Sequence, residues 1–353
     1  MAYVGSSTNA KTLDGKTKKR RTKVERKNED AAKGNPGTIL CFGELIVDCF
    51  GRVENGFFPK FGGAPGNTAI GLRKLGYPAV AFSGMVGSDF FGDFLATTLK
   101  EYGVDTNYLF RSEDKPTTLA FVQVDPDGQR TFTFYPGAHD QMTRGTVQAV
   151  DLAGTSIFHF GSLTQVDIAC AGVTAELLYW ARKQGALISY DPNVRLALSR
   201  NPRALRNVIG NTINQVGVLK VSDEELEFLT GSKEPHIGCQ DLWRNNLQLM
   251  VVTMGRRGAF YKTPKVEGMV DGMPAKVVDT TGAGDAFNAG LLYSLAPHVK
   301  EGKIEDLEEH VEGAIRFANV VAGLSVTKEG AITSLPTLEE AKVMMAAAGG
   351  NST

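Results

Sequence analysis

Several patterns that would place the 353-residue chain in other protein classes are missing from its sequence. There is no G-x-x-x-x-G-K-[ST] segment, which excludes a P-loop nucleotide site. There is no run of about 18 apolar residues, so no transmembrane helix is expected. The four cysteines, Cys41, Cys49, Cys170 and Cys239, show neither C-x-x-C nor metal-ligand spacing, which suits a reducing compartment.

The net charge of the whole chain is also small, −1, but the charged residues are unevenly distributed. Residues 1–37 contain ten Lys/Arg and four Asp/Glu, a net of +6 that leaves −7 for the remainder. An acidic remainder argues against a nucleic-acid surface on the folded part. We therefore expect no nucleic acid as a partner of the folded part, and without a transmembrane helix we expect no membrane as a partner.

Residues 1–37 lack apolar periodicity, so we expect a disordered basic tail there. The run Lys18-Lys19-Arg20-Arg21 could be a nuclear signal or an RNA contact, but a solvated tail is favoured. A secretory signal is excluded because no apolar core is present, and the acidic residues disfavour an organellar transit peptide. The expected location is cytoplasmic, with a plastid or other organelle as the alternative if the tail belongs to a processed targeting region.

The rest of the chain alternates strand and helix patterns. With 42% apolar residues it can bury the core of one α/β domain of about 300 residues. Alternation of this kind predicts a parallel sheet with helices on both faces. Buried strands are expected at 39–42, 79–84, 107–111, 156–160, 186–190, 218–221 and 249–253, and helices at 89–102, 169–184 and 202–213.

A different pattern interrupts these units. Residues 117–124 and 130–135 alternate apolar and polar side chains around Asp125-Pro126-Asp127-Gly128, which predicts a β-hairpin.

The segment Asp279-Thr280-Thr281-Gly282-Ala283-Gly284-Asp285 carries the clearest chemical signal. Residues 275–278 read as the end of a strand, and 286–295 show helical periodicity. A helix that starts at glycines binds anions, because its first N–H groups are unpaired and the helix dipole favours negative charge. A carboxylate at Asp285 would repel a phosphate unless it faces a hydroxyl and takes its proton, which indicates a phosphotransferase. The alternative is an ordinary helix-start carboxylate beside turn glycines.

A second segment, Gly62-Gly63-Ala64-Pro65-Gly66-Asn67-Thr68-Ala69 followed by Leu75-Gly76, resembles the N-terminal signature of the PfkB (ribokinase-like) carbohydrate kinases. The segment from Asp279 to Asp285 resembles their C-terminal signature. The resemblance runs from about Ile39 to about Pro336. Three further segments look most like fructokinases: 43–48 (GELIVD), 189–195 (SYDPNVR) and 220–226 (KVSDEEL).

This resemblance implies an α/β fold, a ribokinase-like three-layer sandwich with a mostly parallel central sheet and a small β-sheet lid. The kinase domain is expected at 38–345, with lid segments at about 52–62 and 115–136, and a disordered tail at 346–353. The lid would exclude water, which competes with the sugar for the phosphoryl group. A homodimer through the lid is a further expectation.

The resemblance also implies roles for individual residues. Asp285 would be the catalytic base, with the backbone of Gly282, Ala283 and Gly284 holding the developing charge. Glu225 would hold the water shell of Mg²⁺, and Asp279 and Thr281 would belong to a site for a monovalent cation such as K⁺. Sugar contacts are expected from Asp48, Gly62, Gly63, Asn67 and Arg195, and nucleotide contacts from Ser222, Thr253, Gly255, Gly258 and Asn319.

Three of these residues have simpler alternatives. Asp48 follows the apolar run 45–47, so we expect it at the C-terminal end of a strand, where ligands gather in open sheets, but it could be a surface turn residue. Asn67 starts a helical pattern and could merely cap that helix. Glu225 could be a first-turn glutamate after a Ser222 cap.

The sequence departs from the family pattern at two points. Ser222 stands where ribokinase-like proteins have the asparagine of an N-x-x-E motif, which we interpret as a character of the fructokinase branch. No arginine follows Tyr135 where ketodeoxygluconate kinases have one for a carboxylate, which favours a neutral sugar. His139, four residues after Tyr135, has no evident role in the sequence.

The expected activity is transfer of the ATP γ-phosphoryl group to a sugar hydroxyl, with D-fructose giving D-fructose 6-phosphate. Ribose, other ketoses or a nucleoside stay open as substrates. A kinase-like scaffold without activity is the competing class, and the presence of Gly282, Gly284 and Asp285 together favours the enzyme.

Overall fold

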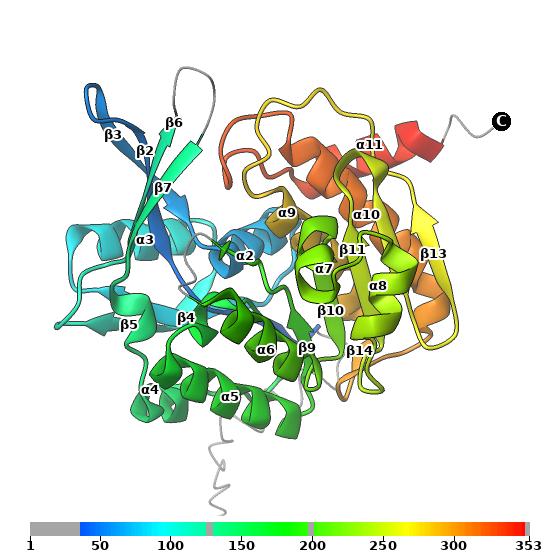
Figure 1. Ribbon diagram of the computed structural model, residues 1–353, viewed down its shortest axis with the longest axis horizontal. Helices are drawn as coiled ribbons and strands as arrows, with labels where there is room; N and C mark the ends of the chain where they lie inside the picture. Colours follow the sequence, from blue (N-terminus) through cyan, green and yellow to red (C-terminus); the bar gives the residue numbers. More distant parts are fainter. Residues whose placement is uncertain (1–35, 125–129, 197–200, 350–353) are drawn as a thin grey trace, which may run out of the picture. The chain divides into compact units, whose positions relative to one another are not determined.

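The computed structural model describes residues 36–124, 130–196 and 201–349, and within them nine strands form a central sheet (Figure 1). The strands from β11 to β5 are parallel, and β12 and β13 extend one edge in antiparallel pairing. The order across the sheet is β13 (Glu267–Val270), β12 (Ala259–Lys262), β11 (Leu249–Thr253), β10 (Val218–Ser222), β9 (Leu187–Tyr190), β8 (Thr155–Phe160), β1 (Thr38–Phe42), β4 (Val80–Gly87) and β5 (Asp105–Ser112).

Both faces of this sheet are buried, since helices cover each of them. Successive side chains of a strand point to opposite faces, so each strand contributes to both cores. In β1, Ile39 and Cys41 belong to one hydrophobic cluster, and Leu40 and Phe42 belong to another. The continuous apolar runs of the sequence therefore supply two cores at once.

Helices cover each face and produce the three layers expected from the sequence. One face carries α2 (Ala64–Lys74), α3 (Phe90–Glu101), α9 (Ala283–Leu295), α10 (Leu307–Ser325) and α11 (Leu338–Gly349). The other carries α4 (Arg144–Ala149), α5 (Ile168–Lys183), α6 (Pro202–Ile213), α7 (Asp223–Thr230) and α8 (Pro235–Leu242). Short elements complete the described chain: η1 (Ala138–Asp140), η2 (Leu163–Gln165), η4 (Gly255–Arg257), η5 (Ala296–His298), β14 (Val299–Lys300) and β15 (Lys303–Ile304).

A second sheet has four strands, ordered β3 (Gly56–Gly62), β2 (Ile46–Arg52), β6 (Leu119–Val124) and β7 (Arg130–Tyr135) (Figure 1). The antiparallel pair β6–β7 confirms the expected hairpin strands; the turn at 125–129 lies outside the described residues. The sheet also contains β2, which pairs with β3 and lies in parallel with β6.

The position of β2 corrects the expectation for Asp48. This residue lies in the middle of β2, not at the C-terminal end of a strand. The reason is that β1 ends at Phe42 and the chain changes sheets at residues 43–45, so the apolar run 45–47 enters the small sheet.

Residues 275–278 also differ from the expectation, because they form no strand. Val277 and Val278 are substantially exposed, and the N–H of Val278 donates to the carbonyl of Val326 at 2.8 Å. Since no neighbouring strand pairs with this segment, β-branched residues alone do not make it one.

The two ends of the chain fall mostly outside the described ranges. Residues 1–35 and 350–353, which hold most of the two expected tails, are not described. Gly37 is described, and its carbonyl accepts a hydrogen bond from the Tyr77 hydroxyl at 2.7 Å. At the other end α11 continues through Gly349, beyond the expected limit of the folded domain at 345.

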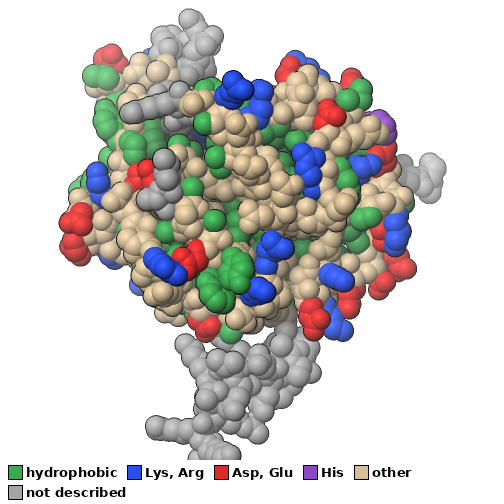
Figure 2. Space-filling view, turned by 60° about the horizontal axis from the view of Figure 1, so that its bottom comes forward, with side chains coloured by type: hydrophobic (Ala, Val, Ile, Leu, Met, Phe, Trp, Pro, Cys, Tyr) green, Lys and Arg blue, Asp and Glu red, His purple; other side chains and the backbone are tan. Residues whose placement is uncertain are grey.

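The surface gives two further observations. On the face in Figure 2, acidic and basic side chains are interspersed and not gathered by sign. Within the described ranges, no helix is both long enough and apolar enough to cross a bilayer.

Candidate active site

Two cavities adjoin the N-terminal end of α9. The larger, about 680 Å³, lies between the small sheet and the loops after β9 and β10. The smaller, about 450 Å³, lies between the loop after β11 and helix α10. Thr280, Ala283 and Gly284 line both cavities, so the start of α9 separates two binding spaces and touches each of them.

The start of α9 has the geometry that the glycine segment predicts. Gly282 is its N-cap, with φ of 76° in the left-handed region that glycine adopts without strain. The first-turn N–H groups have no acceptor within the helix, and this turn lines the larger cavity from Gly282 to Asp285. The site is therefore suited to an anion that bridges the two cavities.

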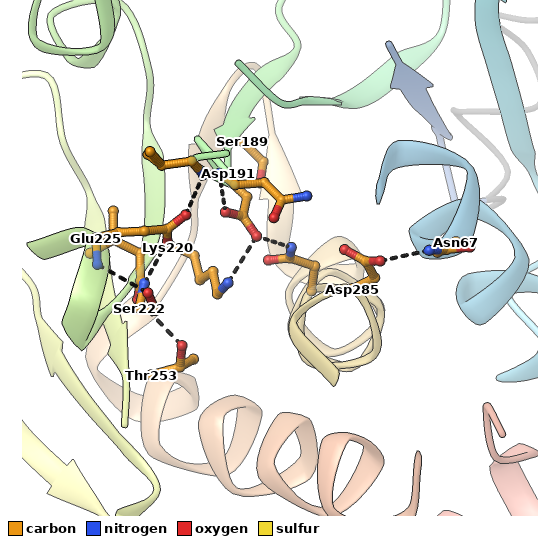
Figure 3. Close-up of polar contacts among 12 residues, drawn as sticks. Asn67, Ser189, Asp191, Lys220, Ser222, Glu225, Thr253 and Asp285 are labelled. Atoms are coloured by element: carbon orange, nitrogen blue, oxygen red, sulfur yellow. Dashed lines mark hydrogen bonds and ion pairs between the residues drawn. The ribbon is translucent and has the colours of Figure 1, made fainter. Parts of the chain in front are cut away.

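Asp285 lies in this first turn and is buried. Its Oδ2 accepts a hydrogen bond from Asn67 Nδ2 at 2.8 Å (Figure 3). Burial raises the pKa of Asp285 to about 7, although the Asn67 hydrogen bond opposes the shift. A carboxylate with that pKa is suited to accept a proton near neutral pH.

Asn67 comes from α2, 218 residues away along the chain. The cap of α2 is Gly63, so Asn67 does not cap the helix, and that alternative is excluded. Its amide instead orients the Asp285 carboxylate at the wall of the larger cavity.

The expected sugar-binding residues gather around the same cavity. Asp48, Gly63, Asn67 and Arg195 line it, whereas Gly62 lies directly beneath the Asp48 carboxylate, where a side chain would collide with it. Burial raises the pKa of Asp48 to about 6, and the charge of Arg195 opposes that shift.

Glu44 also lines this cavity, although the sequence patterns indicate no individual role for it. Its Oε1 accepts the Ala64 N–H at 3.3 Å, while its buried Oε2 has no hydrogen-bond partner within the described residues. Burial raises the pKa of Glu44 to about 7.

A buried ionic network stands behind the anion site. Asp191 Oδ2 accepts hydrogen bonds from Lys220 Nζ at 2.9 Å and from Asn288 Nδ2 at 2.7 Å (Figure 3). Burial alone would raise the pKa of Asp191, but Lys220 and Asn288 hold it below its ordinary value. The network connects the middle of β10 and the residue that follows β9 to α9.

Glu225 and Ser222 form a capping box at the start of α7. The two Glu225 oxygens accept the N–H groups of Val194 at 2.6 Å and Ser222 at 2.7 Å. Burial, together with the charge of Asp191, raises the pKa of Glu225. The simpler alternative for Glu225 thus describes its contacts well, and any metal role would use its remaining lone pairs.

The expected nucleotide residues divide between the cavities. Thr253, Gly255, Gly258 and Asn319 line the smaller cavity, whereas Ser222 lines the larger one. The amide of Asn319 donates to the carbonyls of residues 270 and 271 at 3.1 Å each, so it also holds the neighbouring loop.

The expected cation residues, Asp279 and Thr281, lie in one loop. Asp279 Oδ1 accepts the N–H and hydroxyl of Thr281, and its Oδ2 accepts the N–H of Gly330 at 3.0 Å. Within the described residues, no group of three or more His, Cys, Asp or Glu side chains could hold a metal ion. Mg²⁺ commonly binds through one or two carboxylates together with waters and substrate phosphates, so Glu225 would need a bound nucleotide to complete such a site.

His139 has a structural explanation. It is buried, its Nδ1 lies 2.7 Å from the Thr118 hydroxyl, and burial lowers its pKa. Its ring packs edge-on against Phe134, which lines the larger cavity. His139 therefore supports the cavity wall from behind.

The sequence patterns indicate no individual role for Glu44, Asp191, Lys220 or Asn288. A signal existed for one of them, because Lys220 interrupts the apolar strand Val218–Val221, and a charged residue at a buried position needs a partner. The partner itself is 29 positions away and could not be identified from the pattern.

Comparisons with known proteins identify the family of the chain. The family described as "pfkB family carbohydrate kinase" matches residues 37–338. Fructokinase-2 of Solanum lycopersicum is 37% identical over 319 residues, which is 88% of this chain and 96% of that protein. Probable fructokinase-3 of Arabidopsis thaliana is 37% identical over 321 residues, 88% of this chain and 92% of that protein.

The solved structures that the chain resembles include fructokinases. Fructokinase with bound ATP from Xylella fastidiosa has a TM-score of 0.82 and 34% identity, covering 88% of this chain and 99% of that chain. Fructokinase from Vibrio cholerae O395 in its fructose, ADP and calcium ion bound form has a TM-score of 0.77 and 29% identity, with the same coverage.

Proposed function

The chain belongs to the pfkB family of carbohydrate kinases and is an ATP-dependent carbohydrate kinase, and on that basis we propose that it converts D-fructose to D-fructose 6-phosphate with Asp285 as the general base. The observation that carries the proposal is a buried carboxylate with a pKa of about 7 at the helix start that separates the two cavities.

The larger cavity is the proposed fructose site. Asp48 and Asn67 offer hydrogen-bonding groups to the sugar hydroxyls, and β2 and β6 of the small sheet form its cover. The names of the relatives, which are fructokinases from plants and bacteria, support fructose over ribose, other ketoses or a nucleoside.

The smaller cavity is the proposed ATP site, with the phosphates directed at the start of α9. Asp285 takes the proton of the sugar hydroxyl, a bond forms between that oxygen and the γ-phosphorus, and the bond to the β,γ-bridging oxygen breaks. ADP leaves with the bridging oxygen. The N–H groups of the first turn stabilise the charge on the transferring group, the largest contribution a protein makes to such a reaction.

Two cations fit the residues around this path. Glu225 would hold Mg²⁺ through its water shell, and a bound Mg²⁺ would neutralise charge on the nucleotide phosphates. Asp279 and Thr281, with the loop that ends at Gly330, would hold a monovalent cation such as K⁺.

A homodimer through the small sheet is proposed for the assembly. Val53 is 77% and Phe58 68% exposed on the β2–β3 hairpin, and Tyr135 at the end of β7 is 57% exposed. Large apolar side chains exposed at both edges of the small sheet suggest a surface that another chain covers. Sedimentation of the wild-type protein and a Phe58→Glu variant checks this, and a wild-type monomer at micromolar concentration contradicts it.

A coupled ADP-release assay over a panel of sugars tests the proposed function. We expect kcat/KM for fructose to exceed that for ribose, adenosine and 2-keto-3-deoxygluconate. A ten-fold preference for any of those three would reject the fructose assignment, and no turnover with any sugar would reject the kinase mechanism.

A further inference from the structure

Lys220 occupies an unusual position for a lysine. It lies inside β10, between Leu219 and Val221, and is 6% exposed. Lysine is almost never buried this deeply without a partner. Its partner is Asp191, whose Oδ2 lies 2.9 Å from Nζ, and no role in the reaction has yet been assigned to either residue.

The ammonium group of Lys220 contacts the first turn of α9. A Cβ atom at Gly284 would lie 3.1 Å from Nζ, and Nζ would be its nearest neighbour among the described residues, so the lysine approaches the main chain at a residue without a side chain. Figure 3 shows Lys220 extending from β10 toward Asp191 and the helix that carries Asp285. Gly284 lines both cavities, and Lys220 lines the larger one.

The group stays charged at this position. Burial alone would lower the pKa of Lys220, but the carboxylates of Asp191, Glu225 and Asp285 raise it above its ordinary value. An ammonium has three N–H donors, and Asp191 is its one hydrogen-bond partner in the described residues. Donors therefore remain for a ligand that enters the cavity.

Asp191 sets the direction of the lysine. Its carboxylate is held by Asn288, which lies on α9 one turn after Asp285. The lysine, the start of α9 at Gly284 and the base thus converge on the segment that the two cavities share.

We propose that Lys220 is a catalytic residue whose ammonium donates to an oxygen of the phosphoryl group during its transfer past Gly284. This inference rests on the proposed kinase function. Asp191 and Asn288 are positioning residues that aim the ammonium. The competing explanation is structural, with Lys220 serving only to neutralise Asp191.

A charge-deletion series separates the two explanations. Lys220→Met keeps the length of the side chain and removes the charge, while Asp191→Asn/Lys220→Met removes both partners together. The matched control is Lys233→Met, because Lys233 is an exposed lysine in the loop that follows α7. Kinetics with fructose and ATP and thermal unfolding are measured for each protein.

We expect kcat of Lys220→Met to fall about 10²–10³-fold, as for loss of one donor to a developing oxyanion, with the KM for fructose within about three-fold. The double variant should regain the wild-type unfolding temperature without regaining kcat. Recovery of kcat by the double variant, or an Lys220→Met enzyme within about three-fold of wild type, overturns the proposal.

A measurement on the wild-type enzyme covers the case in which both variants fail to fold. In a crystal structure with ADP, fluoroaluminate and fructose, Nζ should lie within about 3.2 Å of a fluoride, a hydrogen-bond distance. A separation beyond about 4 Å rejects the contact. Wild-type turnover in the same assays distinguishes this failure from a failure of the proposed function, because an inactive wild-type enzyme rejects the kinase mechanism itself.

Discussion

The Asp285 carboxyl lies in the first turn of α9, where the helix start favours its anionic form. It is also buried, which disfavours the charge. These effects oppose each other, and burial prevails, so the pKa rises to about 7. The single hydrogen bond from Asn67 fixes the orientation of the carboxylate without restoring its ordinary acidity. A group held in this way can exchange a proton at neutral pH.

Replacing Asp285 by Asn tests that role. The shape of the side chain is retained and proton acceptance is lost, so we expect kcat to fall at least about 10²–10⁴-fold. Binding of ATP and fructose, measured by calorimetry, should stay within a few-fold. Asp241→Asn, at an exposed carboxylate of α8 that lines neither cavity, should leave both quantities unchanged. An Asp285→Asn enzyme with more than a tenth of the wild-type kcat would falsify the assignment.

The pH dependence follows from the same pKa. Below about 7 the Asp285 carboxyl is protonated and cannot accept a proton, so kcat/KM should rise with pH and level off above about 7. The measurement is a pH–rate profile in buffers of constant ionic strength.

Glu44 needs a control in that experiment, because its pKa is also raised to about 7 and the two carboxyls interact. A Glu44→Gln variant should shift the step in the profile but keep it. Disappearance of the step in this variant would assign the titration to Glu44 and not to Asp285.

At the scale of elements, the start of α9 depends on one backbone conformation. Gly282 has φ of 76°, and a Cβ there would lie 3.1 Å from the Cα and Cβ of Ala331. Both effects disfavour any side chain at this position.

Gly282→Ala should therefore lower stability by about 1–2 kcal/mol and reduce kcat more than about ten-fold, because the first-turn N–H groups shift. Gly313→Ala is the matched control: it lies within α10, a Cβ there meets no described atom within 4 Å, and the change should stabilise by about 0.5–1 kcal/mol. Thermal unfolding and steady-state kinetics measure both. Equal kcat values for the two variants would mean that the helix start does not hold the phosphoryl group.

The local sequence pattern predicted the type of several elements correctly. The runs at 39–42, 218–221 and 249–253 are strands, and the periodic stretches at 169–184 and 202–213 are helices, within a residue or two. The pattern failed at residues 275–278, where exposed valines lack a neighbouring strand. It also failed to place Asp48, because a run of apolar residues does not reveal which of two sheets will pair with it.

At the scale of the whole molecule, the kinase fold begins at the family match near residue 37, and among the residues that the structure describes, none that lines either cavity precedes residue 44. Deleting residues 1–35 should leave kcat/KM for fructose within about three-fold of the full chain.

Extending the deletion to residues 1–37 tests the contribution of the residues directly before the first strand, β1. It removes the Gly37 carbonyl that accepts the buried Tyr77 hydroxyl, so we expect lower stability by about 1 kcal/mol with activity preserved. Differential scanning fluorimetry and kinetics on both truncations are sufficient. A larger loss of kcat/KM with 1–35 removed would mean that the tail contributes to the site.

The sequence by itself determined the alternating strands and helices, the hairpin strands, the glycine segment at a helix start and the membership implied by two signatures. Local periodicity and residue type carry all of these, because they depend on neighbours a few positions apart. Tertiary structure decided the rest: that Asn67 meets Asp285 across 218 positions, that Lys220 pairs with Asp191, and that β2 joins the small sheet. It also decided the proton affinities of the carboxyls, because desolvation depends on what is packed around a group and not on its place in the chain.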